Sequence, residues 1–199
     1  MRISELATAS GVPIATLKFY LREGMLERGT VTAATRAEYG PEHLERVGLI
    51  GALTGVRGLP LAKVREILAI IDEPDADLVA AMGHGVAALP PYVETPTVTS
   101  ERAASTARAL GIEFDPEYPA SAQLEAAIEG LERAGLAWDD DIARRYWDAV
   151  LPLAREELAP VSSMSDREAV AYAVLGTALY EPVILALRRL AHRRLAEDR

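Results

Sequence analysis

The sequence predicts a mostly α-helical protein with a small two-stranded sheet near its N-terminus and an all-helical C-terminal domain. Apolar residues recur at intervals of three and four along most of the chain, which is the spacing of one face of an α-helix. Glycines and prolines divide these runs into short segments, and the short polar segment 27–39 suits a β-ribbon. Half of the 199 residues are hydrophobic, which is enough for two small cores or one larger core.

Two short helices joined through a glycine turn are predicted within residues 3–26. We expect Ser4 to cap the first helix, Gly11 to adopt the positive φ of the turn, and Pro13 to occupy the first position of the second helix. Gly24 is expected to end the second helix. This arrangement is the one that places a second helix in a major groove.

A two-stranded wing is predicted over residues 27–39, turning either at Gly29-Thr30 or in the Thr-Ala-Ala-Thr stretch 32–35. Pro41 then starts a helix, which glycines end, and another helix follows. Apolar residues lie at helical spacing in both: Leu44, Val47, Leu49, Ile50 and Leu53, then Leu61, Val64, Ile67, Leu68 and Ile71. Together these elements predict a winged helix-turn-helix DNA-binding domain over residues 1–72.

The rest of the chain is predicted to be helical. Residues 75–89 fit a helix that carries two internal glycines, at a cost of roughly 1 kcal/mol each, and residues 89–99 form a linker or packed loop. The further expected helices are 100–110, one around 124–131, 142–153 with a bend or end near Pro152, 169–180 opened by a capping box at Ser165 to Glu168, and one that starts at Pro182.

The expected domains are therefore a winged helix-turn-helix over 1–72, a connecting helix and linker over 73–99, and a helical domain for effector binding and dimerisation over 100–199. Segment 169–187 is apolar on all sides, so other parts of the protein or a second subunit must cover it on every side. Its polar interruptions favour a buried helix pair or a subunit interface over a membrane span. We expect the dimer to be built by these last two helices.

Composition excludes several functions. The chain has no cysteine, and its three histidines are far apart, which rules out disulfides, thiolate metal sites and thiol redox sensing. Asp139, Asp140 and Asp141 stand just before a helix and are expected to cap it rather than to bind a metal. No nucleophile, base and orienting group share a recognisable spacing, so we predict no enzyme and no cofactor. No N-terminal targeting segment is visible, and we expect a cytoplasmic protein without a membrane partner.

The net charge of −9 is unevenly distributed. Residues 1–72 hold 9 Lys and Arg against 8 Asp and Glu, whereas residues 73–199 hold 12 against 22. An acidic second part limits adventitious binding to nucleic acid. We therefore expect individual basic side chains of residues 1–72 to make the contacts with DNA.

Residues 14–26 read IATLKFYLREGML, preceded by ISELATASGVP, and residues 37–46 read AEYGPEHLER. This ordered series resembles the MerR family of winged helix-turn-helix regulators over about the first third of the chain. The resemblance implies a homodimer that binds double-stranded promoter DNA and acts on RNA polymerase by distorting an over-long spacer; repression by occlusion is equally open. It places DNA contacts at Ala15, Thr16, Lys18, Tyr20, Arg36 and Tyr39.

Three features depart from the family pattern. Lys18 stands where arginine is common, which loses the planar two-pronged contact with guanine. Ala37 and Glu38 stand where the wing usually has two basic residues, which weakens phosphate contact. Gly83-His84-Gly85 and the following prolines interrupt the position of the long helix that makes the family's dimer, so we expect the dimer contact elsewhere.

Aromatic residues in the second part provide the candidate effector site, and plain core packing is the competing interpretation. The helical body is similar in design to the ligand and dimer domains of TetR-type regulators. Glu181, beside an aromatic and within the apolar stretch, is expected to meet a cationic ligand or to pair with Arg188. An apolar or aromatic small molecule is the expected effector; the alternative is a protein that sequesters a drug or metabolite and keeps a residual DNA-binding head. The candidate effector contacts are Tyr146, Trp147, Tyr172, Tyr180 and Glu181.

Overall fold

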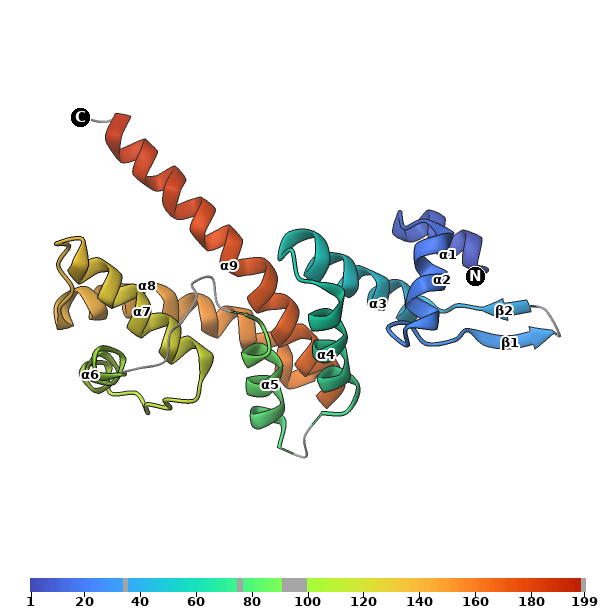
Figure 1. Cartoon of the computed structure of the whole chain (residues 1–199), viewed down its shortest axis with the longest axis horizontal. Helices are drawn as coiled ribbons and strands as arrows, with labels where there is room; N and C mark the ends of the chain where they lie inside the picture. The colour runs from blue at the N-terminus through green and yellow to red at the C-terminus, as the bar shows by residue number, and fades with distance from the viewer. Residues whose placement is uncertain (34–35, 75–76, 91–99, 198–199) are drawn as a thin grey trace. The chain divides into compact units, whose positions relative to one another are not determined.

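The computed structural model describes residues 1–33, 36–74, 77–90 and 100–197. It divides the chain into two compact units, one of Met1–Pro74 with Val174–Arg199 and the other of Asp75–Ala173. Figure 1 labels the helices and strands in chain order. Over the described residues the fold is mostly α with a two-stranded sheet, as predicted. The domain boundaries expected at residues 72 and 99 stay predictions.

A helix-turn-helix opens the first unit. α1 (Ile3–Ser10) and α2 (Ile14–Arg22) are joined at Gly11, whose φ of 70° confirms the predicted turn. Gly24, also with a φ of 70°, follows the end of α2, as expected. Leu17 of α2 is fully buried, which fixes one face of the second helix against the core.

The expected cap of α1 is wrong. Ser4 lies inside the helix, and the backbone N–H of Arg2 donates instead to the Glu5 carboxylate. An acidic side chain in the first turn reaches back to the open end of the helix and also suits the positive end of the helix dipole. Pro13 immediately precedes α2 rather than occupying its first position.

The predicted wing is present. β1 (Thr30–Ala33) and β2 (Arg36–Glu38) pair antiparallel, with Thr30 opposite Glu38. Thr30 lies within β1, so the ribbon does not turn at Gly29-Thr30. Residues 34–35 of the other expected turn lie outside the described ranges.

Gly29 allows a close approach at the base of the wing. A Cβ at this position would lie 2.5 Å from the carbonyl oxygen of Glu38 and 3.2 Å from the Tyr39 ring. Because the first of these neighbours is backbone, it cannot move aside without shifting the strand. Glycine is therefore required by the space available.

The predicted helix pair follows as α3 (Pro41–Gly51), the π-helical turn η1 (Ala52–Val56) and α4 (Leu61–Asp72). Arg46 of α3 holds three segments together: its Nε donates to the carbonyl of Met25 at 2.9 Å, and its guanidinium pairs with Asp72 at the end of α4. Most of the apolar residues at helical spacing form the core, including the buried Val47, Ile50, Leu53, Val64, Ile67, Leu68 and Ile71, whereas Leu61 at the start of α4 is exposed.

All regular elements among the described residues of the second unit are helices. Its elements are α5 (Leu78–Ala87), α6 (Glu101–Leu110), α7 (Pro119–Arg133), α8 (Asp140–Leu158), the 3₁₀ turn η2 (Ala159–Ser163) and the first residues of α9. α6 packs against both α7 and α8. Within the helix expected at 75–89, α5 forms over Leu78–Ala87 despite its glycines. Residues 75–76, and residues 91–99 of the expected linker, lie outside the described ranges.

Caps confirm two predicted helix starts. The Asp139 carboxylate accepts the backbone N–H of Ile142 at 2.8 Å and opens α8. Glu168 accepts the backbone N–H of Ser165 at 2.9 Å and its hydroxyl at 2.6 Å, as the capping box predicts. α8 runs six residues beyond Pro152, so the helix does not end there.

The predicted helix start at Pro182 is wrong, because α9 (Asp166–Glu197) is one continuous helix with this proline inside it. Proline removes one backbone hydrogen bond, but the helix-favouring alanine, leucine and arginine around it carry the helix past that gap. Residues of α9 up to Ala173 belong to the second unit and those from Val174 to the first. By length and composition α9 could cross a membrane, which for one helix is weak evidence.

Candidate DNA-binding surface

The outward face of α2 carries the predicted DNA-reading residues. Ala15 and Lys18 are exposed and Thr16 is half-buried, whereas Leu17 points into the core. Arg22 is exposed four residues after Lys18, so it lies on the same helical face. This face therefore presents two cations beside a small residue, a composition that suits contact with base edges and phosphates.

Arg22 was missed as a candidate from the sequence, although its spacing from Lys18 is the signal that identifies it. Its guanidinium lies over the Phe19 ring, 5.2 Å from the centroid, which holds the side chain against the helix. Glu23 lies between two arginines: its carboxylate oxygens are 3.5 Å from Arg22 Nε and 3.4 Å from Arg65 Nη1. α2 and α4 thus bring two exposed guanidinium groups to one carboxylate.

Tyr20 and Tyr39 are more deeply placed than the other candidates, at 8% and 7% exposed. Burial raises the pKa of Tyr20, so its hydroxyl remains a hydrogen-bond donor at neutral pH. The Tyr39 ring packs edge-on against His43, with centroids 5.1 Å apart. Its backbone N–H donates to the carbonyl of Met1 at 2.8 Å, which joins the end of the wing to the residues before α1.

For the wing, the structure describes fewer side-chain contacts than it does for α2. Arg36 begins β2 opposite Ala33, and its side chain lies outside the described part of the chain. Arg28 and Glu38 are exposed at the base of the ribbon. One cation and one anion at this position agree with the weaker phosphate contact expected from the departure in sequence.

The candidate effector residues are divided between the two units. Tyr146, Trp147 and Tyr172 belong to the second unit, whereas Tyr180 and Glu181 belong to the first. Within the first unit, Glu181 Oε2 lies 3.8 Å from Nη1 of the buried Arg57. The sequence analysis expected Glu181 to meet a cationic ligand or Arg188. It did not consider Arg57, which lies between α3 and α4.

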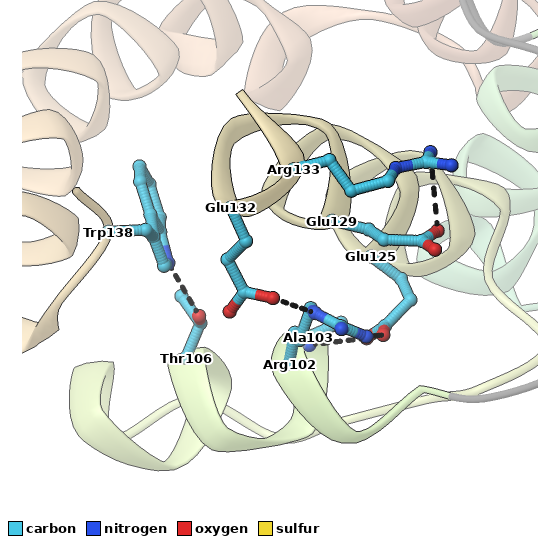
Figure 2. Close-up of polar contacts among 8 residues, drawn as sticks. All are labelled: Arg102, Ala103, Thr106, Glu125, Glu129, Glu132, Arg133 and Trp138. Atoms are coloured by element: carbon cyan, nitrogen blue, oxygen red, sulfur yellow. Dashed lines mark hydrogen bonds and ion pairs between the residues drawn. The ribbon is translucent and has the colours of Figure 1, made fainter. Parts of the chain in front are cut away.

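Aromatic contacts in the second unit centre on Trp138. Its Nε1 donates to the Thr106 hydroxyl at 3.2 Å, as Figure 2 shows, and its ring lies 5.9 Å from that of Tyr146. Tyr146 is half exposed, and Trp147 and Tyr172 are half-buried. These aromatics therefore retain surface that a ligand can reach.

A charged network joins α6 to α7 (Figure 2). The Glu125 carboxylate accepts the backbone N–H of Ala103 and Nη1 of Arg102, both at 2.9 Å, and Arg102 Nε donates to Glu132 at 2.7 Å. Burial by itself raises the pKa of Glu125, but these hydrogen bonds outweigh it and hold the pKa below its usual value. Bonds to Glu132 and then Glu125 raise the pKa of Arg102.

Comparisons with known proteins agree with the fold of the first unit. Residues 1–70 match the family described as "MerR HTH family regulatory protein". The chain is similar to the crystal structure of the "putative transcriptional regulator SCO5550 from Streptomyces coelicolor A3(2)", with 30% sequence identity and a TM-score of 0.76, over 100% of this chain and 97% of that chain. The comparison with curated proteins gives no match. With a family match at its N-terminus and a relative of this identity along its whole length, the chain belongs to the MerR family of helix-turn-helix regulatory proteins, which bind DNA.

Proposed function

We propose that this protein is a sequence-specific transcriptional regulator that binds promoter DNA as a homodimer in the cytoplasm. The observation that carries the proposal is the exposed face of α2, on which Ala15, Lys18 and Arg22 stand out from a helix whose other side is buried. Lys18 and Thr16 read base edges, and the hydroxyls of Tyr20 and Tyr39 together with Arg36 contact phosphates.

The test uses the two lysines of the chain, Lys18 and Lys63. An operator is first selected from a random duplex pool, and its affinity is then measured by fluorescence anisotropy. Lys18→Ala removes a base contact, so specific binding falls by about 1–3 kcal/mol, or roughly 5- to 150-fold. Lys63→Ala is the matched control, because Lys63 already pairs with Glu66 at 2.8 Å. Equal affinity of the two variants for the operator would refute the placement of α2.

The homodimer is proposed to form through α9. Beyond Pro182 its apolar side chains are exposed, including Leu187 and Leu190 at 58% and 59%. A soluble chain does not leave such a row in water without a partner. Light scattering of the full chain checks the stoichiometry, and a monomer at micromolar concentration would contradict this part of the proposal.

The effector is proposed to be an apolar or aromatic organic molecule, cationic forms included, bound near Tyr146, Trp147 and Tyr172. Half-exposed aromatic rings in a unit with excess acid suit cation–π and carboxylate contacts. Titration with a panel of planar cations and neutral aromatics, followed by quenching of tryptophan fluorescence, tests this. A hit that binds Trp147→Phe with unchanged affinity would show that these aromatics only pack.

Regulation is proposed to reach RNA polymerase in one of two ways, by distortion of the promoter spacer or by occlusion. In vitro transcription from a template that carries the selected operator distinguishes them. Added protein raises transcript yield in the first case and lowers it in the second. Tight effector binding by a chain without operator affinity would favour sequestration instead.

A further inference from the structure

One arginine of α3 connects the end of α2 with the end of α4, and all three helices belong to the first unit (Figure 1). Arg46 Nε donates to the carbonyl of Met25, and its Nη2 pairs with Asp72, the last residue of α4. The Arg46 side chain is 12% exposed and Met25 is 1% exposed. Both contacts are therefore largely shielded from water, which strengthens them relative to ion pairs on the surface.

Met25 is tied in turn to α2. Its backbone N–H donates to the carbonyl of Tyr20 at 2.9 Å, and the N–H of Leu26 donates to the same carbonyl at 3.3 Å. With the positive φ of Gly24, these bonds close the C-terminal end of α2. The direction in which Arg46 holds the Met25 carbonyl therefore bears on the last turn of α2, which contains Tyr20.

A second contact between α2 and α4 is weaker. Glu23 pairs with Arg65 of α4 at 3.4 Å, but the Arg65 side chain is half exposed. Exposed pairs contribute little, because water and salt screen them. Of these two ties between α4 and the end of α2, the one through Arg46 is the stronger.

The place of Asp72 in the chain gives this tie a use. The N-terminal part of the first unit ends at Pro74, two residues beyond Asp72, and the chain then enters the second unit. A guanidinium group is planar and its donors have fixed directions. A shift of the Asp72 carboxylate must therefore turn the Nε–H that faces Met25, so the geometry at the end of α4 reaches α2 through one side chain.

We propose that Arg46 is a positioning residue for DNA recognition, which holds the last turn of α2 in its reading orientation while Asp72 anchors the guanidinium. The inference rests on the proposed role of α2 in reading DNA. Contacts with base edges depend on orientation, whereas nonspecific binding depends mainly on charge. Loss of the anchor therefore lowers discrimination between operator and random duplex and leaves nonspecific affinity nearly unchanged.

Asp72→Asn tests this in the full chain, because asparagine keeps the size of the side chain and removes its charge. The ratio of operator to random-duplex affinity, measured by fluorescence anisotropy on the selected operator, should fall by about two- to thirtyfold. Glu73→Gln is the matched control, since it removes the same charge from the next residue, which is exposed. The control should keep the ratio of the wild type, and its random-duplex affinity should equal that of Asp72→Asn.

Arg46→Lys is the second variant. An ammonium group is a single point charge and cannot hold both partners in one plane. Its affinity ratio should fall as in Asp72→Asn, and a ratio equal to that of the wild type would contradict the role given to the guanidinium.

The Met25 carbonyl gives a spectroscopic readout. Methionine labelled with ¹³C at the carbonyl gives few signals, because the chain has 4 methionines. The Met25 signal, assigned by its absence from Met25→Leu, should shift in Asp72→Asn and stay in place in Glu73→Gln.

The outcomes separate this inference from the proposed function. An unchanged affinity ratio in Asp72→Asn, or a Met25 signal that does not move, would overturn the inference. So would an equal fall of both affinities, which is the sign of lost folded protein. If Lys18→Ala still lowers operator affinity in the same assay, the proposed function stands. A wild type that selects no operator would contradict the proposed function and the inference with it.

Discussion

Replacement of Glu125 by glutamine should destabilise the second unit. Glu125 is 7% exposed, and its carboxylate caps α6 from a neighbouring helix by accepting the N–H of Ala103. A hydrogen bond to a charged acceptor contributes about 1.5–3 kcal/mol. The bond to Arg102 adds less, since that side chain is one third exposed and keeps Glu132 as a partner. The glutamine oxygen can still accept the N–H of Ala103 as a neutral acceptor, and its NH2 group then faces the Arg102 guanidinium, so the expected loss is about 1–2 kcal/mol of unfolding free energy.

Tryptophan fluorescence during urea unfolding measures this loss, because Trp138 and Trp147 are the two tryptophans of the chain and both belong to the second unit. Glu129→Gln on the same helix is the matched control. Its pair with Arg133 spans 3.7 Å between exposed side chains, so the change should stay within about 0.5 kcal/mol. If Glu125→Gln unfolds at the same urea concentration as this control, the buried network does not stabilise the unit.

The pH dependence of the same variant has a defined sign. The folded pKa of Glu125 lies below its ordinary value of 4.5, so the folded state favours the carboxylate. Its contribution is complete above the unfolded pKa and is lost as pH falls through the folded one. The difference between wild type and Glu125→Gln should therefore be constant near neutral pH and shrink below about pH 4.5. A difference that grows on acidification would contradict this account.

Three further predictions concern single positions. Gly29→Ala should destabilise the first unit, because the added Cβ meets the backbone of Glu38. Gly48→Ala should stabilise it by about 0.5–1 kcal/mol, since no atom lies within 4 Å of the added Cβ. A melting temperature of Gly29→Ala equal to or above that of Gly48→Ala would contradict the packing. Asp139→Ala should cost about 1 kcal/mol through loss of a cap and Ser4→Ala almost nothing, so equal losses would refute the assigned caps. Arg22→Ala should weaken all DNA sequences alike and lower the salt-dependence slope by about one, whereas loss of discrimination alone would assign it to base contact.

Local rules predicted most of the helices and the wing of residues 1–74, but not that the C-terminal part of α9 belongs to the same unit. Gly11 and Gly24 are positions where glycine provides a positive φ, and the sequence alone identifies them. The cap of α1 was wrong because Ser4 and Glu5 compete for the same helix end, and the longer side chain reaches Arg2. The helix start predicted at Pro182 was wrong because a proline removes a single backbone hydrogen bond, which does not end a helix of this length.

Long-range contacts lay beyond such rules. Glu125 caps a helix 22 residues earlier in the chain, and no periodicity encodes that meeting. The pairing of Glu181 with Arg57 likewise depends on where α9 returns to the first unit. Arg22 is different. Its spacing of four residues from Lys18 is enough to place it on the same face of α2, but the sequence analysis did not include it among the DNA contacts.

α9 has a consequence for the folding of the whole chain. Its buried residues are Ala169, Val170 and Ala173 in the second unit and Val174 and Ala178 in the first, within one uninterrupted helix. A helix of this kind gains most of its stability from the packing of its buried side. Melting either unit exposes part of that side and weakens the remaining turns for the other. We therefore expect the unfolding of the two units to be coupled through α9, so that a molecule that stabilises one unit also raises the melting temperature of the other.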